Sequence, residues 1–316
     1  MPPATTDARP RLETTAWRGL VLVCLTGIIW GTIGPGIDLV YRRSDLTPLT
    51  IGALRAIFAV VTLWAGALLT GRVQACRELL RTSWRRVVAV GLLTASFMLL
   101  FLVAVLTAGV SVATVVALGT APVLLLVLTS VQRRQRPAGR EVVTVGAAVI
   151  GLALVGLSET GGGEGPLWVG LVTALASGCA YALSAEVSGE LTRRHDPLAI
   201  TTTTMSVAAA ILVPGGLLLA WRRGETLVAG DAITWALLAY LGVVTMALAY
   251  VLLFSGLRST PSGAAVVVTL LEPVTAVVLA VTWLGERLTL PAAGGSMLIL
   301  AAIGTIGLRG TDPQPQ

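Results

Sequence analysis

The chain of 316 residues is 55% hydrophobic and 12% charged, with a formal net charge of +6. Soluble domains carry about 25% charged residues, so this composition excludes a soluble globular protein and indicates a multi-pass membrane protein. The positive charge comes from Arg alone, because the chain has no Lys. It suits the cytoplasmic loops of a membrane protein better than a nucleic-acid-binding surface.

Ten apolar segments separated by short polar joints predict ten transmembrane helices, since about 20 residues cross a ~30 Å hydrocarbon core. Their approximate limits are 19–40, 48–70, 87–107, 110–130, 139–157, 166–189, 197–220, 232–256, 261–283 and 290–308. Polar tails, residues 1–18 and 309–316, flank them.

Arginine predicts the orientation of these spans. With the N-terminus inside, 16 of the 22 arginines fall in inner segments and five in outer joints, and Arg55 lies within a span. Because cytoplasmic loops are enriched in Arg, we expect both tails to be cytoplasmic and the chain to lie in the inner (cytoplasmic) membrane.

The second half of the chain repeats the first at an offset of 151 residues. The offset pairs Trp84 with Trp235 and Pro122 with Pro273, residue types that seldom match by chance. Each half holds five predicted spans, and five is an odd number, so the second half enters the membrane inverted relative to the first.

The predicted fold is therefore an all-α membrane protein of ten transmembrane helices in two inverted five-helix repeats. The repeats are residues 19–157 and 166–308, and residues 158–165 form an external linker. Inverted repeats are typical of secondary transporters, whose site lies near the membrane midplane between the repeats.

Few residues of the chain suit metal binding or nucleophilic catalysis. Cys24, Cys76 and Cys179 form no CxxC pair, and the single histidine, His195, lies in a short polar loop. This inventory argues against a zinc site and against a hydrolase that sets a base beside Ser or Cys. We expect no enzyme activity, no metal and no bound cofactor.

Three segments resemble one known family. They are GIIWGTIGPG in the first span, LRAIFA in the second and LEPVTAVVLAVTWLGERLTLPAAGGSMLILAAIGTIG at the end of the chain. They are similar to the EamA family of the drug/metabolite transporter superfamily. The resemblance implies a ten-helix carrier, most often an exporter of amino acids, other metabolites or drugs, but it does not name the substrate. The first half departs from the second at Ala121, which stands where the second has Glu272.

Glu272 lies near the middle of the ninth span and is followed at once by Pro273. A carboxylate at that depth costs roughly 2.5–3.5 kcal/mol on insertion scales and needs an answering group. It could bind a proton or a cationic group of the substrate, or it could pair with Arg55 or a hydroxyl and only hold two helices together. Because Pro273 has no N–H, we expect the carbonyl of Thr269 to lose its helical partner and remain free.

The first span is interrupted by Gly and Pro after Trp30, which points to a binding cavity. The Gly27-x-x-x-Gly31 motif also reads as a small-residue packing seam, and such seams would permit a homodimer. Arg55 lies roughly 10 Å into the second span, where it could hold a carboxylate or snorkel to the interface. Further candidates for the substrate or coupling-ion pathway are Tyr181, Glu186, Thr269, Pro273 and Tyr250.

The sequence thus predicts a secondary active transporter that moves a small metabolite or drug across the cytoplasmic membrane by alternating access. We expect export driven by the proton gradient, with Glu272 as the coupling group. An uncoupled facilitator, a lipid-intermediate flippase and a non-transporting membrane sensor remain as alternatives. The expected partners are a small-molecule substrate and the lipid bilayer, without nucleic acid.

Overall fold

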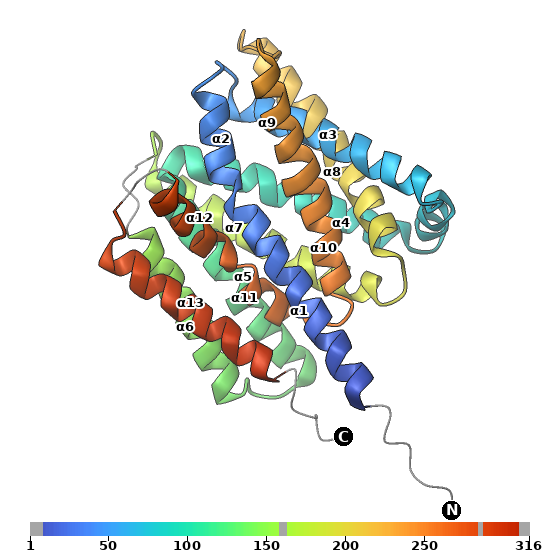
Figure 1. Ribbon diagram of the computed structural model, residues 1–316, viewed down its shortest axis with the longest axis vertical. Coiled ribbons are helices and arrows are strands. Elements are labelled where there is room, and N and C mark those ends of the chain that lie inside the picture. Colours follow the sequence, from blue (N-terminus) through green and yellow to red (C-terminus); the bar gives the residue numbers. More distant parts are fainter. Residues whose placement is uncertain (1–8, 158–162, 284–286, 310–316) are drawn as a thin grey trace, which may run out of the picture.

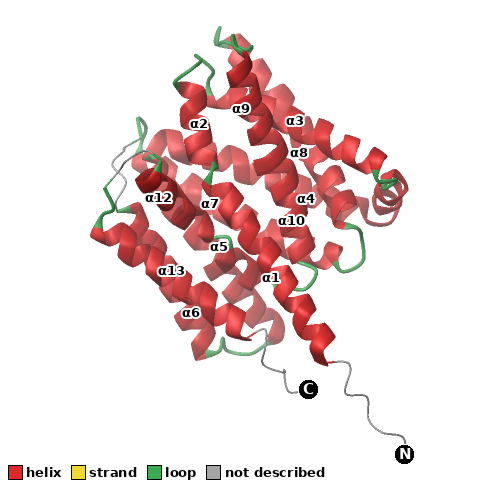
Figure 2. Cartoon of the chain, viewed as in Figure 1, coloured by secondary structure: helices red, strands yellow, loops and turns green. Residues whose placement is uncertain are grey.

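The computed structural model describes residues 9–157, 163–283 and 287–309, and these residues form helices joined by short turns and loops, with no β-strand among them (Figure 2). Parts of the predicted tails and linker, residues 1–8, 158–162 and 310–316, lie outside the described residues.

The helices are α1 (Arg9–Gly31), α2 (Ile33–Tyr41), α3 (Pro48–Leu69), α4 (Val73–Ala108), α5 (Val110–Arg133), α6 (Gly139–Gly156), α7 (Leu167–Thr192), α8 (Pro197–Arg222), α9 (Ala232–Gly242), the π-helix η1 (Val243–Leu248), α10 (Ala249–Gly256), α11 (Ser262–Val268), α12 (Leu271–Thr282) and α13 (Leu290–Arg309). In the described part of the chain, ten helical segments are long and apolar enough to cross a membrane. The predicted ten-span, all-helical architecture is confirmed.

The most extensive contacts between spans follow the symmetry of the two halves. When two spans pack together in this way, the two spans that correspond to them in the opposite halves also pack together. Spans three and six (α4 and α7) pack together, and so do their counterparts, spans eight and one (α10 and α1). Span two packs on span seven (α3 on α8) and span five on span ten (α6 on α13). Figure 1 shows α6 beside α13 and places the described ends of α1 and α13 at the same end of the bundle. The repeats therefore interlock along their whole length, as inverted repeats with a pseudo-two-fold axis do.

One helix is longer than its predicted span. Helix α4 begins at Val73, so the Arg-rich joint expected before residue 87 is helical and not a loop. A helix of 36 residues is about 54 Å long, well beyond a ~30 Å hydrocarbon core. Its backbone is non-helical at Ser83 (φ −138°, ψ 25°), and this kink divides the span from a segment that precedes it.

Glycine seams bring the interlocked helices into close contact. A Cβ atom on Gly151 of α6 would lie 2.7 Å from the carbonyl oxygen of Gly295 on α13. The predicted seam at Gly31 is likewise used inside the chain, because a Cβ there would lie 2.6 Å from the carbonyl oxygen of Glu272. Small residues let helix backbones approach in this way where lipid offers no hydrophobic driving force for helix association.

Substitution of Gly295 by Ala should destabilise the protein, because the added methyl meets the Gly151 backbone, which has no room to yield. Overpacking of this kind costs about 1–3 kcal/mol. We expect Gly295→Ala to lower the midpoint of thermal unfolding in detergent by several degrees. Gly294→Ala, one position earlier on α13, is the matched control, because the carbon added there meets no atom of another helix within 4 Å. Equal midpoints for the two variants would contradict the close α6–α13 seam.

Candidate functional site

Three of the ten spans are interrupted, and the interruptions meet. Span one breaks at Thr32 between α1 and α2, span eight contains η1, and span nine breaks between α11 and α12. Helix α1 packs against η1, α10, α11 and α12, so the three irregular spans are neighbours. Irregular backbone at membrane depth is tolerated only where it is buried in protein or lines a cavity.

The break in span nine corrects the expectation for Thr269. Its carbonyl is not free, because it accepts a hydrogen bond of 3.0 Å from the N–H of Glu272. The backbone tightens into a turn of the 3₁₀ type where Pro273 offers no N–H, and this turn satisfies the carbonyl. Glu272 therefore stands in the first turn of α12.

Thr245, inside the π-helix of span eight, connects three spans. Its carbonyl accepts a hydrogen bond of 3.0 Å from Nε1 of Trp30, and its hydroxyl donates to the carbonyl of Leu241 at 2.6 Å. The same hydroxyl accepts a bond of 3.3 Å from Nη2 of Arg55. No sequence pattern predicted η1; the 151-residue pairing of Thr245 with Thr94 was the only signal that pointed to this position.

Aromatic rings line the same place. The ring of Trp30 lies 5.4 Å from that of Tyr250 and 6.2 Å from that of Tyr181, and all three residues are buried. The hydroxyls of Tyr181 and Thr269 are 2.9 Å apart and share a hydrogen bond. Spans one, six, eight and nine thus place Trp30, Tyr181, Tyr250 and Thr269 in one cluster.

Arg55 and Glu272 bring opposite charges to this cluster without forming an ion pair within 4.0 Å. Arg55 points toward Thr245 and not to the outer interface, and its Nε is buried with no partner among the described residues. The Glu272 carboxylate accepts no hydrogen bond from any residue that the structure describes. Both groups therefore keep hydrogen-bonding capacity for something that is not part of the helix bundle.

Two sequence candidates stand apart from the cluster. Glu186 accepts a hydrogen bond from the hydroxyl of Ser262 on α11, and it lies five residues beyond Tyr181, about 7 Å along α7. Pro273 is buried in the first turn of α12, where it acts through the backbone. The structure brings together six of the eight candidates and leaves Glu186 nearer the end of its helix.

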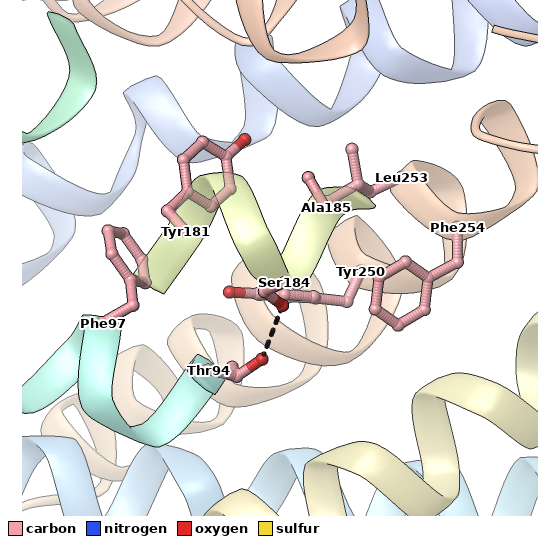
Figure 3. A pocket seen from close by; sticks show the side chains of 8 residues that line it. All are labelled: Thr94, Phe97, Tyr181, Ser184, Ala185, Tyr250, Leu253 and Phe254. Carbon is pink, nitrogen blue, oxygen red and sulfur yellow. Dashed lines mark hydrogen bonds between the residues drawn. The ribbon is translucent and has the colours of Figure 1, made fainter. Parts of the chain in front are cut away.

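A narrow pocket adjoins the cluster (Figure 3). It lies between α4, α7 and α10, and Tyr181 and Tyr250 form part of its wall. The hydroxyls of Thr94 and Ser184 are hydrogen bonded at 3.2 Å across it. The pocket has room for about one water molecule, so it is too small to hold a metabolite.

Helices α2 and α9 lie at the end of the bundle opposite the start of α1 and the end of α13 (Figure 1). The hydroxyl of Thr32, at the break in span one, is hydrogen bonded to that of Tyr240 on α9 at 2.7 Å. Beyond this bond, buried Val40, Ile51 and Leu238 pack in a separate apolar cluster. Within the described ranges, no group of three or more His, Cys, Asp or Glu side chains could hold a metal ion.

Residues 17–157 and 168–308 each match the EamA-like transporter family. The chain belongs to this family. An "Uncharacterized transporter YwfM" of Bacillus subtilis is 27% identical over 85% of this chain and 86% of its own length. An "Uncharacterized transporter" of Archaeoglobus fulgidus is 26% identical over 90% of this chain and 96% of its own length.

A solved crystal structure has the same fold, with a TM-score of 0.76 and 17% identity over 96% of this chain and 98% of the other. The family match covers both repeats, and the relatives are named as transporters. This EamA protein is accordingly a multi-pass membrane transporter.

Replacing Trp30 by Phe should loosen the junction of spans one and eight, because the Thr245 carbonyl loses its indole donor and the smaller ring leaves part of the buried space unfilled. Loss of one such hydrogen bond costs about 0.5–1.5 kcal/mol. We expect a lower unfolding midpoint in detergent for Trp30→Phe than for Trp168→Phe, whose parent side chain is 69% exposed. An unchanged midpoint for Trp30→Phe would show that the Trp30–Thr245 bond does not stabilise the π-helix.

Proposed function

We propose that this EamA protein is a proton-coupled secondary carrier that exports a small metabolite or drug across the cytoplasmic membrane by alternating access. One observation carries the proposal. Arg55 and Glu272, two opposite charges without an ion pair between them, lie where three interrupted spans from both repeats meet. Substrate sites of transporters built from inverted repeats occur at such discontinuous helices.

The narrow pocket beside Tyr181 and Tyr250 supports alternating access. It holds about one water molecule, so a metabolite could pass this way only if the surrounding spans rearranged. The interruptions at Thr32, η1 and Thr269 lie in spans one, eight and nine, while the counterparts of spans one and nine, α7 and α5, run unbroken. Irregular turns of this kind can act as hinges, because a few residues absorb the change in backbone angles. They would let spans one, eight and nine move relative to the spans without interruptions.

Glu272 is the group that we assign to proton coupling. Its carboxylate has no fixed hydrogen-bond partner among the described residues, so it can take up or release a proton without breaking the bundle. In the proposed cycle, a proton binds Glu272 when the site faces the outside and leaves it when the site faces the cytoplasm. Substrate moves in the opposite direction.

Arg55 is the group that we assign to an anionic part of the substrate. A guanidinium offers five N–H donors in a planar fork that matches a carboxylate, and only one bond, to Thr245, is formed by Arg55 here. The buried Nε faces no protein acceptor in the described part of the chain. A substrate carboxylate would satisfy it, and the rings of Trp30 and Tyr250 would then enclose the apolar part of the substrate.

The orientation follows from charge. With the tails inside, most of the arginines face the cytoplasm, as expected for a cytoplasmic-membrane protein. The Thr32–Tyr240 hydrogen bond and the apolar cluster beyond it then lie on the outer side of the site, and the pocket beside Tyr181 and Tyr250 lies on the cytoplasmic side. A pocket on the cytoplasmic side suits the loading of an export substrate.

Glu272→Gln should abolish flux driven by a pH gradient and leave substrate exchange measurable, because the amide keeps the shape of the side chain but cannot carry a proton. The measurement is flux in proteoliposomes with an imposed gradient, over a panel of amino acids, polyamines, nucleosides and cationic dyes. Glu186→Gln, the matched control on α7, should retain gradient-driven flux. Equal loss of exchange and driven flux in Glu272→Gln would favour a binding or structural role over coupling.

The same panel separates the alternative functions. Wild-type flux that ignores the gradient would indicate a facilitator, and binding without flux would indicate a sensor. Silence toward every water-soluble compound, from folded protein, would favour a lipid flippase.

Arg55→Gln should weaken transport of those panel members that carry a carboxylate, since charge-assisted hydrogen bonds contribute about 1.5–3 kcal/mol, or roughly 10- to 100-fold in KM. Arg55→Lys should recover only part of the loss, because a point charge cannot form the planar fork. Arg222→Gln, at the exposed end of α8, serves as the control. If Arg55→Gln raised KM equally for cationic dyes and for carboxylates, the assignment of Arg55 to a carboxylate would be wrong.

A further inference from the structure

The first ten residues of α4, Val73–Thr82, form a helix that is separate from the membrane span it leads into. We call this segment the surface helix. It ends at the kink of Ser83, and the rest of α4 is by itself long enough to cross the hydrocarbon core. The surface helix is therefore available for a role other than spanning the bilayer.

One face of the surface helix is fixed to the protein. Cys76 and Leu79 are fully buried, and both belong to the main hydrophobic core. An ion pair of 3.2 Å joins Arg72 to Asp196, just before α8, and a second of 3.0 Å joins Arg86 to Glu190 of α7. The ends of the segment are thus held, and its outward face has a defined orientation.

The outward face carries exposed arginines. Arg77 and Arg81 lie four residues apart on the surface helix, Arg85 lies just beyond the kink, and none of the three forms an ion pair within the described residues. Exposed Glu78 offsets one of the three charges. The face is therefore basic. Its three arginines differ from Arg72 and Arg86 at its margins, because each of those two is paired with a carboxylate.

Apolar side chains accompany these arginines. Leu80 is 40% exposed and Trp84 is 55% exposed, and the Arg85 guanidinium lies 5.6 Å from the centre of the Trp84 ring. Exposed Trp is enriched at the boundary between hydrocarbon and headgroups. Trp84 directly follows the kink at Ser83 and begins the membrane span. Its position therefore places the outward face of the surface helix at the level of the lipid headgroups.

We propose that the surface helix, together with Trp84 and Arg85, is a binding surface for anionic phospholipid headgroups. Guanidinium groups bind phosphate oxygens through paired hydrogen bonds, and a basic segment beside a membrane gains affinity for anionic lipid with each unpaired Arg. Leu80 and Trp84 would insert at the acyl boundary while Arg77, Arg81 and Arg85 reach the phosphates, the arrangement expected of an interfacial amphipathic helix. This proposal stands independently of the substrate and of proton coupling.

The test uses the full chain in nanodiscs of phosphatidylcholine with a fixed fraction of phosphatidylglycerol. Bromine, which quenches Trp fluorescence on contact, is placed on the acyl chains of one lipid or the other, so that the composition stays constant. The Trp84 component is the difference between wild type and Trp84→Phe. We expect bromine on phosphatidylglycerol to quench it about fivefold more strongly per lipid, the ratio that corresponds to roughly one well-placed Arg.

In the variant Arg77→Gln/Arg81→Gln/Arg85→Gln, the Trp84 fluorescence should be quenched equally by either brominated lipid. The matched control, Arg133→Gln/Arg134→Gln/Arg136→Gln, removes the same charge from the joint after α5 and should keep the preference. Equal quenching in wild type would overturn the proposal. So would loss of the preference in the control, which would mean a general charge effect. An absence of quenching by either lipid would mean that water or another protein covers this face.

Discussion

The bilayer interior offers no water to a backbone N–H or carbonyl, so the backbone groups that an interrupted span frees have to find partners inside the protein. The break before Glu272 is closed by a tight turn within span nine, and the hydroxyl of Thr32 bonds to the carbonyl of Ile29 at 2.6 Å within span one. The π-helix of span eight receives its partner from span one, because the Trp30 indole donates to the Thr245 carbonyl. These partners let the three irregular spans pack together, and the polar site lies where they and the two repeats meet.

The two repeats share a scaffold but not its chemistry. Pro122 lies inside an unbroken α5, whereas its counterpart Pro273 follows a break, so the proline alone does not interrupt the span. The offset also sets Ala121 against Glu272 and Ser206 against Arg55. The charged residues and the irregular backbone of the site lie in spans one, two, eight and nine, and the equivalent spans of the opposite halves lack them at the matching positions. This asymmetry gives the site a direction that a symmetric pair of repeats would lack.

Ten spans could be predicted from apolar runs of membrane length, and the 151-residue offset gave their pairing. Trp30, Arg55 and Tyr181 were predictable as site candidates because polar or aromatic groups at membrane depth need partners. The π-helix could not be predicted, since no residue type in Val243–Leu248 marks the wider turn. The helical start of α4 could not be predicted, because a segment rich in arginine between two spans is typical of a loop. In the structure, buried Cys76 and Leu79 pack against the core and stabilise this segment as a helix.

The π-helix has a consequence for the length of span eight. A π-turn holds one residue more than an α-turn, and each residue of an α-helix turns it by about 100°. Deleting one residue between Val243 and Leu248 would let the wide turn close as an ordinary α-turn, so the helix after it would keep its orientation and Tyr250 would still face Trp30. The π-helix therefore fits one more residue into span eight than a regular helix would, without turning the aromatic cluster away from span one.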